Sequence, residues 1–317
     1  MAAKIFIDGE AGTTGLQIRD RLAGRRDLEV ISIAADKRKD LDERKRLLNA
    51  ADVAILCLPD DAAKQSVSLI ENDTTRVIDA STAYRINPDW AYGFAEMDQD
   101  QPEKIANARF VANPGCWPQG LIANLRPLLA AGLLPADFPI SYNGISGYTG
   151  GGKQMIAEYE AAGDAASQFM PYGLTFNHKH VPEMTKYTGL SSAPLFVPNV
   201  GGFAQGMTTF VPLQLGQLAK VPGGKDIHAA IADHFAGIKD SFVTVAPYDP
   251  ALGKTPALDP QAHNNTNTMT LHVFANDARA QAVLVAVYDN LGKGASGAAV
   301  QNLNLMLGVS ARESLAA

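Results

Sequence analysis

The chain has 317 residues, of which 46% are hydrophobic, and it carries a formal net charge of −6. This length allows two domains with separate cores, and the apolar fraction excludes a disordered chain. The acidic balance, without a long basic run, argues against nucleic acid as a partner. No apolar stretch approaches the roughly 20 residues of a membrane span, so no membrane partner is expected. Only two cysteines, and a strand that starts almost at the N-terminus, predict a cytoplasmic protein.

The first predicted strand, over residues 4–8, is followed by a glycine-rich turn. The turn has the spacing GxxGxxG before a predicted helix, a variant of the fingerprint that binds dinucleotides. Glycines permit a tight turn and a close approach to a pyrophosphate, to which helix N-terminal amides and hydroxyls donate. A plain turn before a helix is the alternative. The predicted cofactor-binding residues here are Gly9, Gly12, Thr13, Thr14 and Gly15.

Strands and helices then alternate along the first third of the chain. This alternation is typical of a Rossmann-type doubly wound parallel sheet, with the ligand at the carboxyl ends of the strands. Cys57 lies in a continuous apolar run, so we interpret it as a core residue without chemistry. The predicted strands cover residues 29–33, 52–58 and 76–79, and the predicted helices cover residues 40–49 and 60–71.

The segment after the second strand bears on the choice of cofactor. It reads Ala34-Ala35-Asp36-Lys37-Arg38-Lys39, small residues followed by an acid and three cations. Cations suit a ribose 2′-phosphate, so Lys37 and Arg38 favour NADP over NAD. A solvated charge run that opens the next helix is the alternative.

A thiol follows a Pro-Gly turn near residue 116. Residues 109–112 predict a buried strand, and an apolar stripe after Pro118 predicts a helix, so Cys116 is expected at a helix N-terminus. Orphan amides and the helix dipole stabilise a thiolate there. The dipole contributes only about 0.3–1 kcal/mol, so a cation or general base must act as well. The alternative is a small buried apolar residue.

The second half predicts an α+β domain with a large mixed sheet. Its last two strands are predicted to form a hairpin around residues 276–279, and such a sheet often supplies a subunit interface. The tail over residues 293–306 predicts a helix that returns to the first domain. We therefore expect an NADP-binding domain over residues 1–117 and 296–317, and a catalytic and dimerisation domain over residues 118–295. The predicted strands cover residues 138–146, 194–199, 207–215, 242–246, 269–275 and 281–289.

Two further segments carry polar chemistry. The glycines of residues 144–153 leave backbone amides free to meet a ligand, unless the segment is a flexible connector. His178 and His180 share a face if that segment is extended, and either one suits a general base for the thiol. A structural pair is the alternative. No third ligand cluster accompanies the histidines, so we expect no metal.

With these motifs in place, the chain resembles the N-acetyl-γ-glutamyl-phosphate reductase family in its shorter form, nearly end to end. Asn-Pro-Gly-Cys is the most specific element of the resemblance. Trp117-Pro118-Gln119 stands where many relatives have Tyr-Pro-Thr. The segments that carry the resemblance are residues 9–15, 77–85, 113–116, 146–147, 180–183 and 293–304.

The resemblance implies roles for individual residues. Cys116 corresponds to the nucleophile and His180 to the acid and base, with His178 as the alternative. The implied substrate-binding residues are Arg85 and Asn113 at the phosphate, together with Ser146, His178 and Glu183. The implied cofactor-binding residues, beyond those of the glycine turn, are Ser81, Gly147 and Asn302, and they join Lys37 and Arg38, which the charge pattern predicts. Residues 34–39 depart from the Ser-containing NADP loop that is usual in the family.

The implied activity is reduction of a small acyl phosphate by NADPH in a homodimer or homotetramer. The Cys116 thiolate displaces phosphate, and the resulting thioester accepts a hydride. One rival is an enzyme similar to aspartate-semialdehyde dehydrogenase that acts on another acyl phosphate. A second rival is a redox-sensing dinucleotide-binding protein without catalysis.

Overall fold

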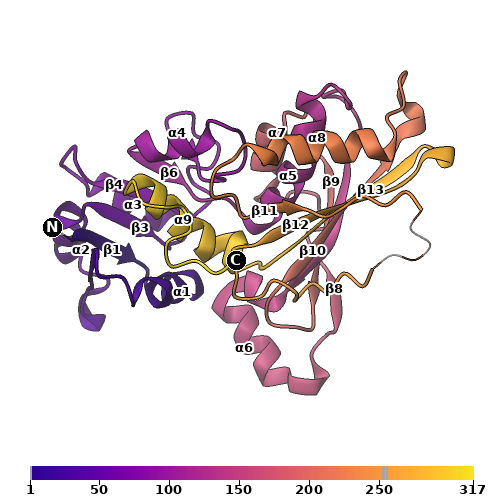
Figure 1. The fold of residues 1–317 in the computed structure, drawn as a ribbon. Helices are drawn as coiled ribbons and strands as arrows, with labels where there is room; N and C mark the ends of the chain where they lie inside the picture. The colour runs from indigo at the N-terminus through magenta and orange to yellow at the C-terminus, as the bar shows by residue number, and fades with distance from the viewer. Residues whose placement is uncertain (1, 252–253, 255) are drawn as a thin grey trace. The chain divides into compact units, whose positions relative to one another are not determined.

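The computed structural model describes residues 2–251, 254 and 256–317, and the chain divides into two compact units (Figure 1). The first unit contains residues 1–95, 100–115 and 295–316. The second contains residues 96–99, 116–294 and 317. Each unit is described by itself.

The first unit is built on a parallel sheet with the strand order β2-β1-β3-β4-β6-β5. Its interior strands are buried on both faces, which explains why they are continuous apolar runs rather than alternating ones. The strands are β1 (Ala3–Asp8), β2 (Leu28–Ile31), β3 (Val53–Leu56), β4 (Arg76–Asp79), β5 (Ala91–Tyr92) and β6 (Phe110–Ala112). The helices are α1 (Thr13–Leu22), α2 (Leu41–Ala50), α3 (Asp60–Ser68), α4 (Gln101–Asn107) and α9 (Gly297–Met306).

Helix α9 is the C-terminal element of the first unit and packs against α1, α4 and β4. Its small residues, among them Ala298 and Ala299, are buried and allow this close packing. The sequence predicted one helix over residues 293–306, whereas a π-helical turn over Gly292–Ser296 precedes α9. Gly292 has no space for a side chain, because a Cβ there would lie 2.1 Å from the carbonyl oxygen of Thr266.

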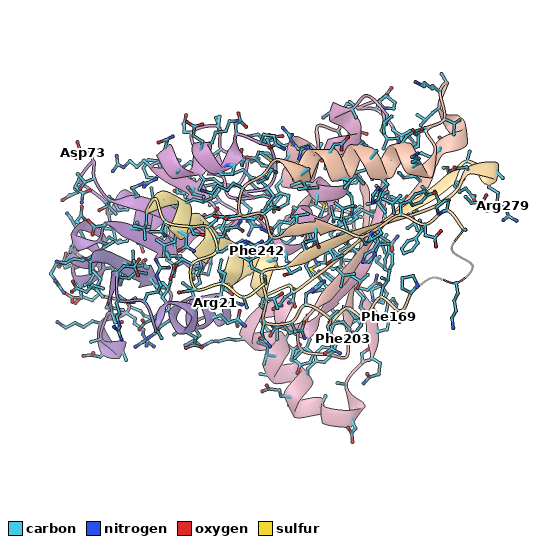
Figure 2. All side chains as sticks on the ribbon, viewed as in Figure 1. Arg21, Asp73, Phe169, Phe203, Phe242 and Arg279 are labelled. Atoms are coloured by element: carbon cyan, nitrogen blue, oxygen red, sulfur yellow. The ribbon has the colours of Figure 1, made fainter. Side chains whose placement is uncertain are left out.

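The second unit is built on a mixed sheet with the strand order β11-β12-β13-β10-β7-β9-β8. The predicted hairpin is confirmed, since β12 and β13 pair antiparallel from Met269↔Tyr288 to Asn276↔Gln281. Arg279 marks its tip in Figure 2. The strands are β7 (Ser141–Gly147), β8 (Phe169–Pro171), β9 (Leu195–Gly201), β10 (Met207–Gln214), β11 (Val243–Val245), β12 (Met269–Asn276) and β13 (Gln281–Tyr288).

Helices of the second unit cover one face of this sheet (Figure 1). α5 (Cys116–Ala130) packs on β10 and β13, and α8 (Gly224–Ala236) packs on β11 and β12. α7 (Val181–Thr188) packs on α5. The α/β class, with a parallel sheet in one unit and a large mixed sheet in the other, is as predicted.

The second unit also corrects several sequence predictions. Helix α6 (Gly152–Ala162) begins within the last two residues of the glycine-rich segment 144–153 and continues where no element was predicted, and none of its residues is buried. Its first residue, Gly152, has a positive φ of 74°, which favours glycine. The strand predicted from residue 138 begins at Ser141, because the amide of Phe138 donates to Pro135 in a turn.

Candidate active site

Cys116 is the first residue of α5, so its predicted position at a helix N-terminus is confirmed. Its thiol is free of any disulfide and partly buried. Gly294 lies against this residue, since a Cβ on Gly294 would stand 2.9 Å from the Cβ of Cys116. A side chain at position 294 would therefore displace the nucleophile candidate.

Two buried tyrosines hold the first turn of α5. The hydroxyl of Tyr288 donates to the carbonyl oxygen of Cys116 at 2.7 Å, and the hydroxyl of Tyr142 donates to that of Trp117 at 2.7 Å. Burial raises the pKa of both tyrosines, and a negative charge at Cys116 raises the pKa of each further. Both phenols therefore remain protonated donors at any working pH.

The two histidines lie together, although the segment that carries them is not extended. They occupy a turn before α7, with His180 in a right-handed helical conformation. His178 Nδ1 accepts from the amide of His180 at 3.1 Å, and the ring centroids are 4.7 Å apart. The turn therefore brings the two imidazole rings together, and not the alternation of side chains along a strand.

An aromatic chain joins these histidines to the start of α5. Trp117 Nε1 donates to the Tyr172 hydroxyl at 3.0 Å, and the Tyr172 ring meets His178 edge-on at 5.8 Å. Burial raises the pKa of Tyr172, and a negative charge at Cys116 raises it further. The second unit thus places a thiol, a buried phenol and an imidazole pair in one neighbourhood.

The structure places the other predicted residues of the second unit as follows. Ser146 is the last residue but one of β7 and only 4% of its surface is exposed, and Glu183 lies in the first turn of α7 with 1% exposed. The amide of Gly147 is not free, because it donates to the carbonyl oxygen of Gly206 at 2.9 Å. Gly147 is required there for close packing, since a Cβ would lie 2.4 Å from the carbonyl oxygen of Ala204.

In the first unit, the glycine turn forms between β1 and α1. Gly9 has a φ of 91°, and a Cβ there would lie 2.4 Å from the carbonyl oxygen of Cys57. A Cβ on Gly15 would lie 2.6 Å from the carbonyl oxygen of Gly9. Gly12 is the N-cap, and Thr13 and Thr14 open the helix, so their amides belong to its unsatisfied first turn. This cradle fits the pyrophosphate of a dinucleotide.

Arg38 and Lys37 lie just beyond β2 with exposed side chains. An Arg38 guanidinium nitrogen is 3.8 Å from a carboxylate oxygen of Glu10, which also accepts from Arg19 at 3.3 Å. Glu10 comes from the glycine turn itself and is 6% exposed. An ion pair therefore connects the glycine turn to the cationic segment, and the sequence alone did not predict it.

Arg85, Asn113 and Asn302 form one network inside the first unit. Arg85 Nε donates to the Asn113 carbonyl oxygen at 3.0 Å, and Asn302 Nδ2 donates to Asn113 Oδ1 at 3.0 Å. Ser81 lies two residues beyond the end of β4, and its hydroxyl donates to Asp79 Oδ2 at 2.6 Å. Burial raises the pKa of Asp79 to about 6, and Arg85 and Ser81 oppose that shift.

Cys57 follows β3 and packs against the core of the first unit. Burial raises the pKa of its thiol to about 12, with smaller contributions from Asp79 and Asp8. A thiol with this pKa is not a nucleophile at neutral pH. The contrast with Cys116 separates the two cysteines by environment.

Sequence reasoning also missed the buried pair of Glu96 and Lys293. Lys293 Nζ donates to Glu96 Oε2 at 2.6 Å, and their side chains are 1% and 0% exposed. Phe242, labelled in Figure 2, lies beneath the ammonium group at 5.8 Å. Lys293 also connects to α5, since its carbonyl oxygen accepts from Gln119 Nε2 at 2.8 Å. The only signal in the sequence was a lysine among small residues before the tail helix.

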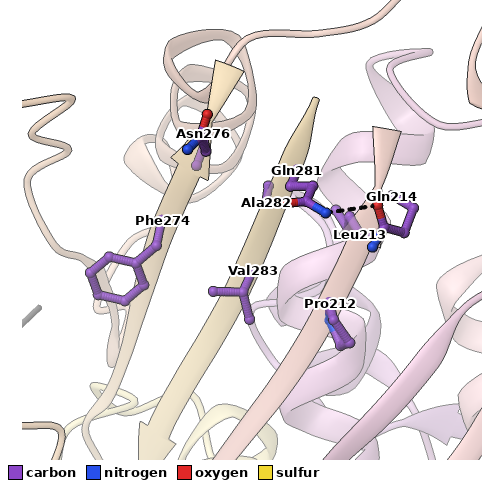
Figure 3. A pocket seen from close by; sticks show the side chains of 9 residues that line it. Pro212, Leu213, Gln214, Phe274, Asn276, Gln281, Ala282 and Val283 are labelled. Carbon is purple, nitrogen blue, oxygen red and sulfur yellow. Dashed lines mark hydrogen bonds between the residues drawn. The ribbon is translucent and has the colours of Figure 1, made fainter. Parts of the chain in front are cut away.

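A shallow cavity of about 360 Å³ lies elsewhere on the second unit, over β10, β12 and β13 (Figure 3). Gln281 and Gln214 join across its rim at 3.2 Å. Tyr288 is at the other end of β13, on the order of 20 Å away at the rise of a strand. This cavity is therefore separate from the Cys116 neighbourhood.

None of the helices among the described residues is long and apolar enough to cross a membrane. The described residues also contain no group of three or more His, Cys, Asp or Glu side chains arranged to hold a metal ion.

In comparisons with known proteins, two family models match separate parts of the chain. The family model "Semialdehyde dehydrogenase, NAD binding domain" matches residues 4–108, and "Semialdehyde dehydrogenase, dimerisation domain" matches residues 116–290. A protein of Chelativorans sp. (strain BNC1) named N-acetyl-gamma-glutamyl-phosphate reductase is 66% identical over 307 residues, covering 97% of this chain and 99% of that one.

Two more relatives extend the comparison. A protein of the same name from Mesorhizobium japonicum is 66% identical over 309 residues, covering 98% of this chain and 100% of that one. Among solved structures, aspartate semialdehyde dehydrogenase II from Vibrio cholerae has a TM-score of 0.72 at 15% identity, over 97% of this chain and 99% of that one. At this identity the solved structure is evidence for a shared fold.

Proposed function

Because this chain belongs to the N-acetyl-gamma-glutamyl-phosphate reductase family, we propose that it reduces N-acetyl-L-glutamyl 5-phosphate to N-acetyl-L-glutamate 5-semialdehyde. Phosphate is released, and the acyl group is carried as a thioester on Cys116. The main structural support is the thiol at the start of α5, linked through Trp117 and Tyr172 to the histidine pair of the same unit.

The chemistry of the thiol follows from its position. The sulfur attacks the acyl carbon of the substrate, the bond to the phosphate oxygen breaks, and a thioester remains. Unsatisfied amides in the first turn of α5 stabilise the anionic sulfur and the oxyanion of each tetrahedral intermediate. Bound NADPH supplies the hydride that reduces the thioester carbonyl. His180 takes the thiol proton and returns it as the thiohemiacetal collapses to the semialdehyde, with His178 as the alternative.

The first unit supplies the cofactor site in this proposal. The turn of Gly9, Gly12, Thr13, Thr14 and Gly15 holds the pyrophosphate, and Lys37 and Arg38 meet the ribose 2′-phosphate of NADP. The remaining cofactor-binding residues are Ser81, Gly147 and Asn302. In the same proposal, the NADP-binding domain covers residues 1–117 and 296–317, and the catalytic and dimerisation domain covers residues 118–295.

The substrate-binding residues in this proposal are polar. Arg85 and Asn113 bind the phosphate, a role supported by a planar guanidinium fork that suits phosphate oxygens. Ser146, His178 and Glu183 bind the rest of the substrate.

We also propose a homodimer or homotetramer in the cytoplasm. The sheet face opposite α5 and α8 leaves apolar side chains such as Phe274 and Val283 only partly buried, which supports an interface between copies.

The decisive experiment follows NADPH formation from N-acetylglutamate semialdehyde, phosphate and NADP⁺, with NAD⁺ in parallel. We expect turnover with NADP⁺, and a loss on the order of a thousandfold or more in Cys116→Ser, because an alcohol is a far weaker nucleophile and leaving group than a thiol. NADPH binding to Cys116→Ser, measured by fluorescence titration, stays at the wild-type level.

Cys57→Ala is the matched control, since it removes the other thiol and leaves turnover intact. Near-normal activity of Cys116→Ser would refute the covalent assignment. Turnover of aspartate semialdehyde in place of the N-acetylated substrate would favour the first rival. Cofactor binding without turnover of either aldehyde, and with Cys116 resistant to alkylation, would favour a regulator.

A further inference from the structure

The first two carbonyl groups of α5 receive hydrogen bonds from different strands of the sheet. Tyr288 comes from β13 and donates to Cys116, while Tyr142 comes from β7 and donates to Trp117, each at 2.7 Å. Both tyrosines are fully buried. The two hydrogen bonds are therefore nearly identical in length, donor and burial.

The two peptide groups that accept these bonds differ in whether their nitrogen carries a hydrogen. The carbonyl of Cys116 belongs to the peptide whose nitrogen is the amide N–H of Trp117. The carbonyl of Trp117 belongs to the peptide whose nitrogen is that of Pro118, which carries no hydrogen. Only the first peptide has a donor to offer.

A hydrogen bond at a carbonyl oxygen polarises the whole peptide group. It draws electron density toward the oxygen and makes the N–H of the same peptide a stronger donor, an effect enhanced at low dielectric. Trp117 is the second residue of α5, so its N–H is one of the unsatisfied donors at the helix start. These donors stabilise an anion beside the N-terminus.

We propose that Tyr288 is a positioning residue that strengthens the Trp117 amide as a donor to the Cys116 thiolate and to the oxyanion formed on it. Tyr142 makes the equivalent bond to a peptide without an N–H and serves only to fix the helix. This inference rests on the proposed role of Cys116 as nucleophile.

The hydroxyl of Tyr288 stays protonated beside Cys116. Burial raises its pKa, and charges at Tyr142 and Cys116 raise that pKa further, while a charge at Cys116 also raises the pKa of Tyr142. The other groups around the helix start are Tyr142 from β7, Tyr172 after β8, the His178–His180 turn before α7, and the Lys293–Glu96 pair. Neither Phe substitution removes the histidines, Tyr172 or the Lys293–Glu96 pair.

The test measures alkylation of Cys116 by iodoacetamide across pH, by mass analysis of its peptide, in wild type, Tyr288→Phe and Tyr142→Phe. For Tyr288→Phe we expect the midpoint of the rate to move up by about 0.1–0.7 pH unit, because polarisation adds about 10–30% to a charge-assisted hydrogen bond. In the same variant kcat/KM falls by a factor of about 1.3–5. Tyr142→Phe keeps the wild-type midpoint.

Pro118→Ala provides a second test that does not depend on the folding of Tyr288→Phe. It restores an N–H to the second peptide, so adding Tyr142→Phe in this background should now raise the midpoint. Equal midpoints for Tyr288→Phe and Tyr142→Phe would overturn the proposal. So would equal midpoints for Pro118→Ala with and without Tyr142→Phe. Alkylation needs no substrate, so this failure is distinguishable from failure of the proposed reaction.

Discussion

At the scale of single residues, Asp79 is a buried acid at the carboxyl end of β4. Burial raises its pKa to about 6 from an ordinary value of 3.8, although two hydrogen bonds from Ser81 and the charge of Arg85 oppose the shift. Between these two values the folded state binds a proton that the unfolded chain releases. Ionisation of Asp79 therefore lowers stability as the pH rises from about 4 to about 6.

Asp79→Asn should remove this pH dependence. We expect the unfolding free energy of the variant, relative to wild type, to rise by on the order of 3 kcal/mol between pH 4 and pH 7.5, since the shift is about two pKa units. Denaturant titrations at each pH provide the measurement. Asp61→Asn on the exposed start of α3 is the control, and its difference from wild type should stay constant. A constant difference for Asp79→Asn would contradict the assignment.

At the scale of elements, α5 approaches the sheet through a glycine. A Cβ on Gly120 would lie 2.7 Å from Thr209 Oγ1, 2.8 Å from the Tyr288 hydroxyl and 3.0 Å from the Tyr142 hydroxyl. These three oxygens come from β10, β13 and β7, so one glycine lets the helix contact three strands. The distance of α5 from the sheet in turn sets where Cys116 lies.

Gly120→Ala should destabilise the protein even though alanine is the better helix former by about 1 kcal/mol. Overpacking against the three hydroxyls costs about 1–3 kcal/mol, and the displaced helix start lowers the rate of Cys116 alkylation. Thermal unfolding and the alkylation rate measure the two effects.

Gly24→Ala is the matched control, because no atom lies within 4 Å of a Cβ at Gly24. It should leave both quantities unchanged. Equal stability of the two alanine variants would show that α5 can move away from the sheet without cost.

At the scale of the whole molecule, residues 96–99 belong to the second unit, although the residues before and after them in the sequence belong to the first. Glu96 is fixed there by Lys293, 197 residues away in the sequence, and by the amide of Phe242 at 3.0 Å. Burial lowers the pKa of Lys293, while Glu96 opposes that shift. The buried ammonium therefore depends on its partner.

Glu96→Gln should cost about 3–5 kcal/mol, because it leaves the Lys293 ammonium buried without a counter-charge. The double variant Glu96→Gln with Lys293→Met should recover much of that loss, since no charge then remains in the interior. Denaturant unfolding of the single and double variants tests this. Glu43→Gln, which breaks the exposed Glu43–Arg46 pair on α2, is the control and should match wild type. Additive losses in the double variant would contradict a coupled pair.

The sequence by itself determined the features that neighbouring residues control. The glycine turn after β1, the start of α5 at Cys116 and the hairpin of β12 and β13 each follow from periodicity and turn residues within a few positions. Local patterns failed where tertiary contacts dominate. The amide of Gly147 donates to Gly206, so it is not free to meet a ligand as the local pattern suggested.

Only the tertiary structure decided which distant side chains meet. Tyr142 and Tyr288 are ordinary strand residues in the sequence, and only the order of β13, β10 and β7 brings their hydroxyls to one helix turn. The same holds for Glu96 and Lys293. Backbone preferences act over a few residues, whereas buried polar groups bond to whichever groups the folded chain places nearby. These partners are therefore determined by packing and not by their spacing in the sequence.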